Sequence, residues 1–173
     1  VTTHTDTSTS IRSDIPALRA ALDRTQHPAL LMIDCIASLG CEPYWHDEWG
    51  VDVTVAACQK GLMTPAGLSF NFIGAKAWQA HAKANLRSPY WDWEARVHGK
   101  IFHQKFSGTP PTHHLFALRA ALDILLNEGM PAVWRRHQRL ASAVWAAVEA
   151  WSSEGALTLN VSEEKSRSTA VTT

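Results

Sequence analysis

The 173-residue chain has no net charge and no long apolar run, and both absences exclude classes of partner. Sixteen Lys and Arg residues balance sixteen Asp and Glu residues, so no excess positive charge attracts nucleic acid or an anionic membrane surface. No apolar run approaches the roughly 18 residues of a membrane span, and the chain does not open with the basic and then apolar pattern of a signal peptide. We therefore expect no nucleic acid and no membrane partner, and small neutral or zwitterionic ligands suit this charge balance.

The chain also has few cysteines, and these lack the spacing of a cross-linked or metal-bound framework. Cys35, Cys41 and Cys58 are odd in number and form no C-x-x-C pair, which argues against disulfides and zinc clusters and predicts a reducing, cytoplasmic location. Nine histidines do not predict a metal site, because the adjacent His113 and His114 cannot share one face of a helix.

The apolar pattern alternates between strands and helices. Capping residues and helical spacing predict helices, while short apolar or β-branched runs predict strands, some of them covered on both faces as in a parallel sheet. The predicted strands are 29–33, 51–57 and 67–73, with strand ends at 1–3 and 168–173, and the predicted helices are 14–27, 75–85, 113–127 and 131–151.

This order predicts an α/β domain with a mostly parallel sheet flanked by helices, followed by long helices that lead to a small C-terminal domain. The corresponding ranges are 1–110, 111–151 and 152–173. The chain has no initiator Met and both of its ends read as interrupted strands, so we expect a central segment of a longer protein.

Two strand ends carry the residues with the clearest chemistry. Asp34 ends one apolar run, and Lys60 follows another. In open α/β sheets the ligand crevice lies at the carboxyl ends of the strands. A lysine amine there can form an imine with a carbonyl cofactor, and a carboxylate can keep a pyridine nitrogen protonated so that the ring accepts electrons. Taken singly, a lysine after a strand is usually a surface residue and an aspartate there is usually a turn former.

The motifs around this pair resemble those of the class V aminotransferases of fold type I. Within that family they most resemble the motifs of alanine–glyoxylate and serine–glyoxylate (serine–pyruvate) transaminases. The resemblance covers nearly the whole chain and lies in segments that follow one another in the family's order. These segments are HTDTSTS at 4–10, DCIASLG at 34–40, WGVDV at 49–53, CQKGLM at 58–63, PAGLS at 65–69 and FSGTPP at 106–111.

The resemblance implies pyridoxal 5'-phosphate as cofactor and assigns roles around it. Lys60 would be the Schiff-base lysine and the proton shuttle, and Asp34 would pair with the pyridine nitrogen. Thr7 would form a hydrogen bond near the phenolic oxygen of the cofactor.

The resemblance also implies a phosphate site and a homodimer. Gln59 and Cys58 would face the cofactor phosphate, and the loop that carries Thr109 would complete the site of the neighbouring subunit. The chain departs from the family at Cys58, where a serine is common, because a thiol is a weaker donor than a hydroxyl.

The implied reaction is transamination between a small amino acid, alanine or serine, and a keto acid, glyoxylate or pyruvate. Two alternatives stay open. One is another class V enzyme that uses the same lysine and aspartate, resembling a desulfurase or a kynureninase. The other is a non-catalytic fragment, because the family's phosphate loop and ring-stacking aromatic residue lie before Val1 and its carboxylate-binding arginine lies after Thr173.

Overall fold

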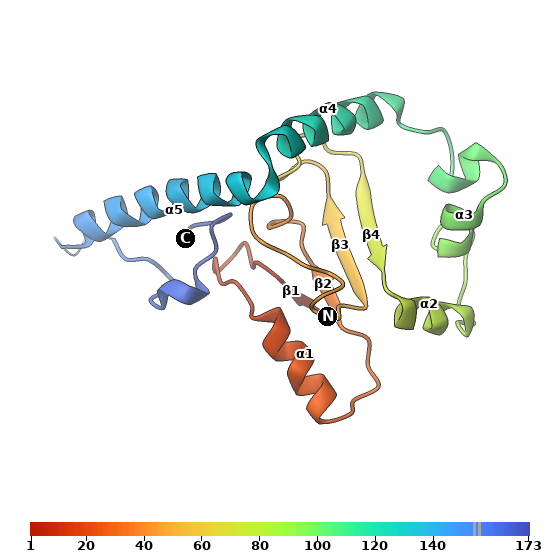
Figure 1. Ribbon diagram of the computed structural model, residues 1–173, viewed down its shortest axis with the longest axis horizontal. Helices are drawn as coiled ribbons and strands as arrows, with labels where there is room; N and C mark the ends of the chain where they lie inside the picture. Colours follow the sequence, from red (N-terminus) through yellow and green to blue (C-terminus); the bar gives the residue numbers. More distant parts are fainter. Residues whose placement is uncertain (154, 156) are drawn as a thin grey trace.

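The computed structural model describes residues 1–173 except 154 and 156, and its centre is one four-stranded sheet (Figure 1). The strands lie in the order of the sequence: β1 (Thr2–Thr3), β2 (Met32–Asp34), β3 (Val53–Ala57) and β4 (Ser69–Ile73). The first three are parallel and β4 runs antiparallel to β3. The prediction of an α/β fold with a mostly parallel sheet is confirmed.

Outside the sheet, the described residues form five α-helices and two short 3-10 helices. They are α1 (Ile15–Arg24), α2 (Ala75–Ala82), α3 (Trp93–His98), η1 (Phe102–Phe106), α4 (Thr112–Glu128), α5 (Met130–Ser152) and η2 (Glu164–Ser166). Figure 1 shows α4 and α5 following one another across one side of the molecule, α1 on the opposite side, and α3 far from α5. The long helices are therefore present as predicted, while the division of the chain into three domains stays a prediction.

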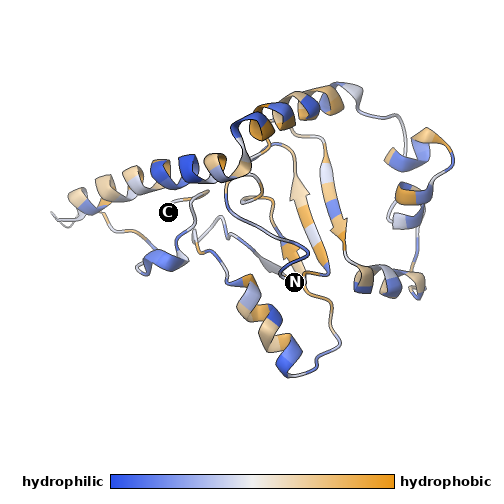
Figure 2. Cartoon of the chain, in the orientation of Figure 1, coloured by the Kyte–Doolittle hydropathy of each residue, from blue (hydrophilic) through white to orange (hydrophobic). Residues whose placement is uncertain are grey.

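A hydrophobic core joins α1 to the centre of the sheet. Ile33 on β2 and Cys35 just after it are buried against Ile15 of α1 and against Leu31 and Val51. Figure 2 shows the corresponding hydrophobic colour along β2 and β3. Burial of this kind supplies the main driving force for folding.

A second hydrophobic cluster ties the turn after β3 to the two long helices. Leu62 of the turn, Leu125 of α4 and Val133 of α5 are all buried in it. Between these helices Gly129 has a φ of +83°, a backbone conformation that glycine adopts without steric cost. The cluster thus positions the segment that contains Lys60 relative to α4 and α5.

The strands β2, β3 and β4 all begin two or three residues later than predicted, and before β2 and β3 a side chain takes part of the backbone pairing. Leu31 N donates to the Asp52 carboxylate at 2.7 Å, so the predicted strand 29–33 becomes β2 at Met32–Asp34 and the predicted strand 51–57 becomes β3 at Val53–Ala57. The predicted strand 67–73 becomes β4 at Ser69–Ile73.

Two helices end earlier than predicted, because side chains bind the carbonyls at their ends. Thr25 Oγ1 donates to the carbonyls of Ala21 and Leu22 at the end of α1. The Arg87 guanidinium donates to the carbonyls of His81 and Ala82 at the end of α2. Such contacts satisfy the carbonyls that lack a partner within the helix.

The predicted strand at 168–173 is wrong. Ala170 N and Val171 N both donate to the Ser168 hydroxyl, at 3.0 and 3.3 Å, so these backbone groups bind a side chain rather than a neighbouring strand, and the segment bends. The short helices α3, η1 and η2 were not predicted. Among the residues that the structure describes, no helix has both the length and the apolar content needed to cross a membrane.

Candidate active site

The carboxyl ends of β1, β2 and β3 meet at one edge of the sheet, because these strands are parallel. His4 N donates to the Asp34 carbonyl and Cys35 N donates to the Val55 carbonyl, both at 2.8 Å. Asp34 Oδ1 accepts a hydrogen bond from Ile36 N at 2.8 Å. The other Asp34 oxygen has no hydrogen-bond partner among the described residues, so it is able to accept a donor from a ligand.

Lys60 lies in a tight turn after β3 that its own backbone and a threonine hold in place. Thr64 Oγ1 donates to the Cys58 carbonyl at 2.9 Å, and Met63 N donates to the Lys60 carbonyl at 2.9 Å. The turn packs closely on the segment after β2, since a Cβ at Gly61 would overlap the Leu39 carbonyl oxygen and lie 2.8 Å from Cys41 Sγ. Lys60 itself is exposed, and its amine has no partner among the residues described.

Lys60 and Thr7 line the same cavity, which has a volume of about 280 Å³. The segment after β2, the start of α5 and the residues near 170 form its other walls. The complete lining is Thr7, Ala37, Cys41, Lys60, Gly61, Met63, Leu125, Arg136, His137, Ala170 and Val171. The structure thus brings together two of the predicted site residues from segments that are more than fifty residues apart in the sequence. Asp34, Gln59, Cys58 and Thr109 do not line this cavity.

Gln59 and Cys58 precede Lys60 but point to different surroundings. Gln59 is exposed, whereas Cys58 is fully buried. The Cys58 thiol donates to the Pro65 carbonyl at 3.1 Å and accepts from Leu68 N at 3.3 Å. Burial alone would raise the pKa of this thiol, but the Thr64 hydroxyl and nearby backbone N–H groups more than offset that effect and lower the pKa. Cys58 would contact a phosphate only after giving up these bonds.

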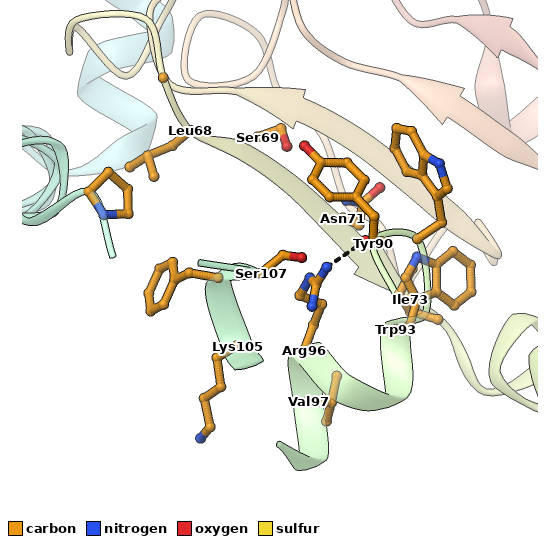
Figure 3. A pocket seen from close by; sticks show the side chains of 14 residues that line it. Leu68, Ser69, Asn71, Ile73, Tyr90, Trp93, Arg96, Val97, Lys105 and Ser107 are labelled. Atoms are coloured by element: carbon orange, nitrogen blue, oxygen red, sulfur yellow. Dashed lines mark hydrogen bonds between the residues drawn. The ribbon is translucent and has the colours of Figure 1, made fainter. Parts of the chain in front are cut away.

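Thr109 lies on an exposed loop between η1 and α4, and it does not line the Lys60 cavity of its own chain. A separate pocket of about 430 Å³ lies beside this loop, between β4 and α3 (Figure 3). Its lining includes Tyr90 and Trp93, and Arg96, which donates to the Tyr90 carbonyl. This pocket is larger than the Lys60 cavity, but none of the predicted site residues lines it.

Sequence reasoning missed two residues of α5 in the Lys60 cavity. Arg136 forms a two-bond ion pair with Glu128 at 2.9 and 2.8 Å, and His137 follows it. Burial and the neighbouring Arg136 charge lower the pKa of His137, so the neutral imidazole is favoured. Helical spacing puts His137 in line with the apolar positions of α5 but gives it no chemical role, and Arg136 lies among arginines that on a long helix usually face solvent.

A buried polar cluster behind the cavity was also missed. Glu42 and His4 are 1% and 2% exposed, and His4 Nδ1 lies 2.9 Å from Ser38 Oγ. Burial lowers the pKa of His4, Glu42 opposes this effect, and Arg12 adds to it. Burial also raises the pKa of Cys35 to about 12, so that thiol stays protonated. Within the described residues, no group of three or more His, Cys, Asp or Glu side chains is placed to hold a metal ion.

Comparison with known proteins identifies the family. The family model described as aminotransferase class-V matches residues 1–173. The chain belongs to the class V aminotransferases. The resemblance seen in the sequence motifs is therefore confirmed.

The relatives of this class V chain include several glyoxylate aminotransferases. The L-aspartate–glyoxylate aminotransferase of Paracoccus denitrificans is 41% identical over 149 residues, which cover 86% of this chain and 37% of that protein. The serine–glyoxylate aminotransferase of Hyphomicrobium methylovorum is 42% identical over 152 residues, with the same coverage of 86% and 37%. The chain thus spans 37% of the length of these two relatives.

A solved structure supports the same fold for this class V chain. The alanine–glyoxylate aminotransferase from Nostoc sp. superimposes with a TM-score of 0.81 at 28% sequence identity, and the match covers 96% of this chain and 43% of that one.

Proposed function

We propose that this chain is part of a pyridoxal-phosphate-dependent aminotransferase that moves the amino group of alanine or serine to glyoxylate or pyruvate. The observation that carries the proposal is the Lys60 amine, which has no partner among the described residues and faces the cavity that Thr7 also lines. The cavity lies at the carboxyl edge where β2 ends in Asp34. Named aminotransferases among the relatives support the reaction class.

The side chains present fit the proposed cofactor in their chemistry. Lys60 offers an amine, Thr7 an exposed hydroxyl and Asp34 a carboxylate oxygen that no described residue occupies. When bound, pyridoxal phosphate supplies an aldehyde that condenses with amines and a ring that accepts electrons from the substrate Cα.

In the proposed mechanism Lys60 acts twice. Its amine would hold the cofactor aldehyde, and once a substrate amine takes its place, the free Lys60 amine would accept the proton from the substrate Cα and carry it on its own nitrogen until it is given back. Asp34 would accept the N–H of the ring nitrogen and so favour its protonated form, because a nearby carboxylate stabilises a positive charge. Thr7 would orient the ring through its hydroxyl.

The remaining predicted contacts form the proposed phosphate site and dimer. Gln59 is exposed beside Lys60 and is able to donate to a phosphate, and Cys58 is proposed to contribute through the turn it stabilises. Thr109 is proposed to reach the phosphate of the second subunit in a homodimer, which accords with its exposed loop and its distance from the cavity of its own chain.

The proposal is tested by labelling the protein in its full natural length. Protein mixed with pyridoxal phosphate should gain a visible absorbance band, borohydride should fix the cofactor on Lys60 in peptide maps, and L-alanine or L-serine should bleach the band until glyoxylate or pyruvate restores it. Lys83→Ala, which removes an exposed lysine of another segment, is the matched control for Lys60→Ala. Fixation at a different lysine would refute the role of Lys60.

The same samples separate the alternative functions. Release of sulfur from cysteine or cleavage of kynurenine, without transamination, would indicate a desulfurase or kynureninase activity. Absence of any band in correctly folded protein would indicate a non-catalytic chain.

A further inference from the structure

Glu42 is a fully buried carboxylate that the proposed mechanism does not use. Its side chain is 0% exposed, and each oxygen accepts hydrogen bonds from a different part of the chain. Oε2 accepts from Thr5 Oγ1 at 2.7 Å, while Oε1 accepts from Ser168 Oγ at 2.8 Å and from the backbone N–H and the hydroxyl of Thr169. Burying a charge is costly unless such donors surround it, and here both oxygens are occupied.

The segments that Glu42 holds are those that form two walls of the Lys60 cavity. Thr7, Ala170 and Val171 line the cavity. Thr5 lies two residues before Thr7, and Thr169 lies directly before Ala170. The connection on the second side is continuous, because the Ser168 hydroxyl that donates to Glu42 also accepts from Ala170 N and Val171 N.

These walls have little regular structure of their own. Residues 168–173 form neither helix nor strand, and residues 5–10 form a turn with a single isolated bridge. Their positions therefore depend on side-chain hydrogen bonds to a greater degree than those of β2 or β3 do. Glu42 is itself anchored in the segment after β2, where its N–H donates to the Ser38 carbonyl at 3.0 Å.

We propose that Glu42 is a positioning residue of the Lys60 site, which fixes the Thr7 wall and the Ala170–Val171 wall in one geometry without contacting substrate or cofactor. The kinetic part of this inference rests on the proposed function, whereas the structural part does not. Displacement of a positioning group by about 1 Å can slow an enzyme roughly 100-fold, so loss of the carboxylate should reduce turnover although Lys60 stays in place.

Two measurements on the full-length protein test this role. Hydrogen exchange should show that Glu42→Ala speeds exchange of the amides of residues 169–171 by about tenfold or more. The Thr169 N–H loses its acceptor, and the Ser168 hydroxyl that accepts from Ala170 N and Val171 N loses the partner that orients it. In steady-state assays kcat/KM should fall by roughly 10- to 100-fold, while borohydride still fixes pyridoxal phosphate on Lys60.

Conservative variants separate positioning from general stability. Glu42→Gln should restore most of the rate and the slow exchange, because its amide oxygen can accept from Ser168 and Thr169 and its NH₂ can donate to Thr5 Oγ1. Glu48→Ala removes an exposed glutamate of the same loop and should behave as wild type. Ser168→Ala should reproduce part of the Glu42→Ala defect, and the double variant should be less than additive because the two residues share one hydrogen bond.

The outcomes distinguish this inference from the proposed function. If folded Glu42→Ala shows exchange and kcat/KM within about twofold of wild type, or if Glu42→Gln is no better than Glu42→Ala, positioning by Glu42 is refuted although Lys60 labelling stands. If Glu42→Ala does not fold, Ser168→Ala and Thr5→Val carry the same measurements. If wild-type Lys60 is not labelled, the proposed function fails, and hydrogen exchange still decides whether Glu42 holds residues 169–171.

Discussion

Replacement of Leu125 by alanine tests the packing that places the Lys60 turn against the long helices. Leu125 is 2% exposed and packs with Leu62 of the turn and Val133 of α5. It also lines the Lys60 cavity. A change at this one position should therefore affect both the stability of the fold and the binding of the cofactor.

The magnitude follows from the atoms removed. Leu125→Ala deletes three buried carbon groups, which at about 0.8 kcal/mol each gives a transfer cost of about 2.4 kcal/mol. A residual cavity adds a further cost, which brings the usual total for such substitutions to 2–5 kcal/mol, so roughly 3–4 kcal/mol is expected here. The neighbouring Met130 packs against the same cluster, and its flexible side chain should fill part of the space and keep the loss from reaching the upper limit.

The assay is urea unfolding of the full-length protein, with Leu126→Ala as the matched control. Leu126 is the next residue of α4 and is 64% exposed, so the same substitution there should change the free energy of unfolding by no more than about 0.5 kcal/mol. Equal losses for the two variants, or a loss below about 1 kcal/mol for Leu125→Ala, would show that the cluster is not packed as described.

Three further predictions concern single side chains. Lys60→Ala should abolish turnover while some pyridoxal phosphate still binds, as measured by steady-state assay and by retained absorbance after gel filtration; residual turnover of the purified variant would contradict the assignment. Asp34→Ala should reduce kcat by about 100-fold or more, because the ring nitrogen loses the group that holds its proton, and unchanged kcat would argue against that pairing. The pKa of His4 lies below its ordinary value of 6.5 because burial disfavours the charged form. The unfolded chain therefore gains a proton that the folded chain does not, and the free energy of unfolding should fall below pH 6.5 by at most about 1.4 kcal/mol per pH unit. His4→Gln should flatten that part of the pH curve, and an identical curve in chemical denaturation would refute this origin.

The elements that the sequence predicted correctly are those that a local pattern of apolar residues determines. Strand runs around Ile33 and Val55 and the long helices on either side of Gly129 carry periodic or apolar signals that survive in the structure. The placement of Asp34 at the end of β2 and of Lys60 in the turn after β3 followed from the same pattern, since each residue comes directly after a run of mostly apolar residues. The shared cavity of Lys60 and Thr7 did not follow from the pattern and came only from the family motifs.

What the sequence could not predict depends on contacts between distant segments. The Asp52 carboxylate binds Leu31 N across 21 positions of sequence and so shifts the start of β2. Glu42 binds the Ser168 hydroxyl across 126 positions, and the same hydroxyl accepts from Ala170 N and Val171 N, where the sequence predicted a strand. A charged residue in a loop usually faces solvent, which is why neither carboxylate stood out before the fold was known.

Asp34 and Glu42 are both carboxylates near the carboxyl edge of the sheet, and the residue type alone does not say which of them binds a ligand. The hydrogen-bond donors around each one distinguish their roles. Glu42 accepts hydrogen bonds on both oxygens from donors of its own chain and its side chain is 0% exposed, so a ligand does not reach it and its role is internal. From the residues that the structure describes, Asp34 accepts a hydrogen bond on Oδ1 alone, and the other oxygen would be costly to leave unpaired in a closed site. A ring N–H that donates to the second Asp34 oxygen would therefore bind a carboxylate that the Ile36 N–H already holds in place. This difference in hydrogen-bond saturation is the physical reason to seek chemistry at Asp34 and positioning at Glu42.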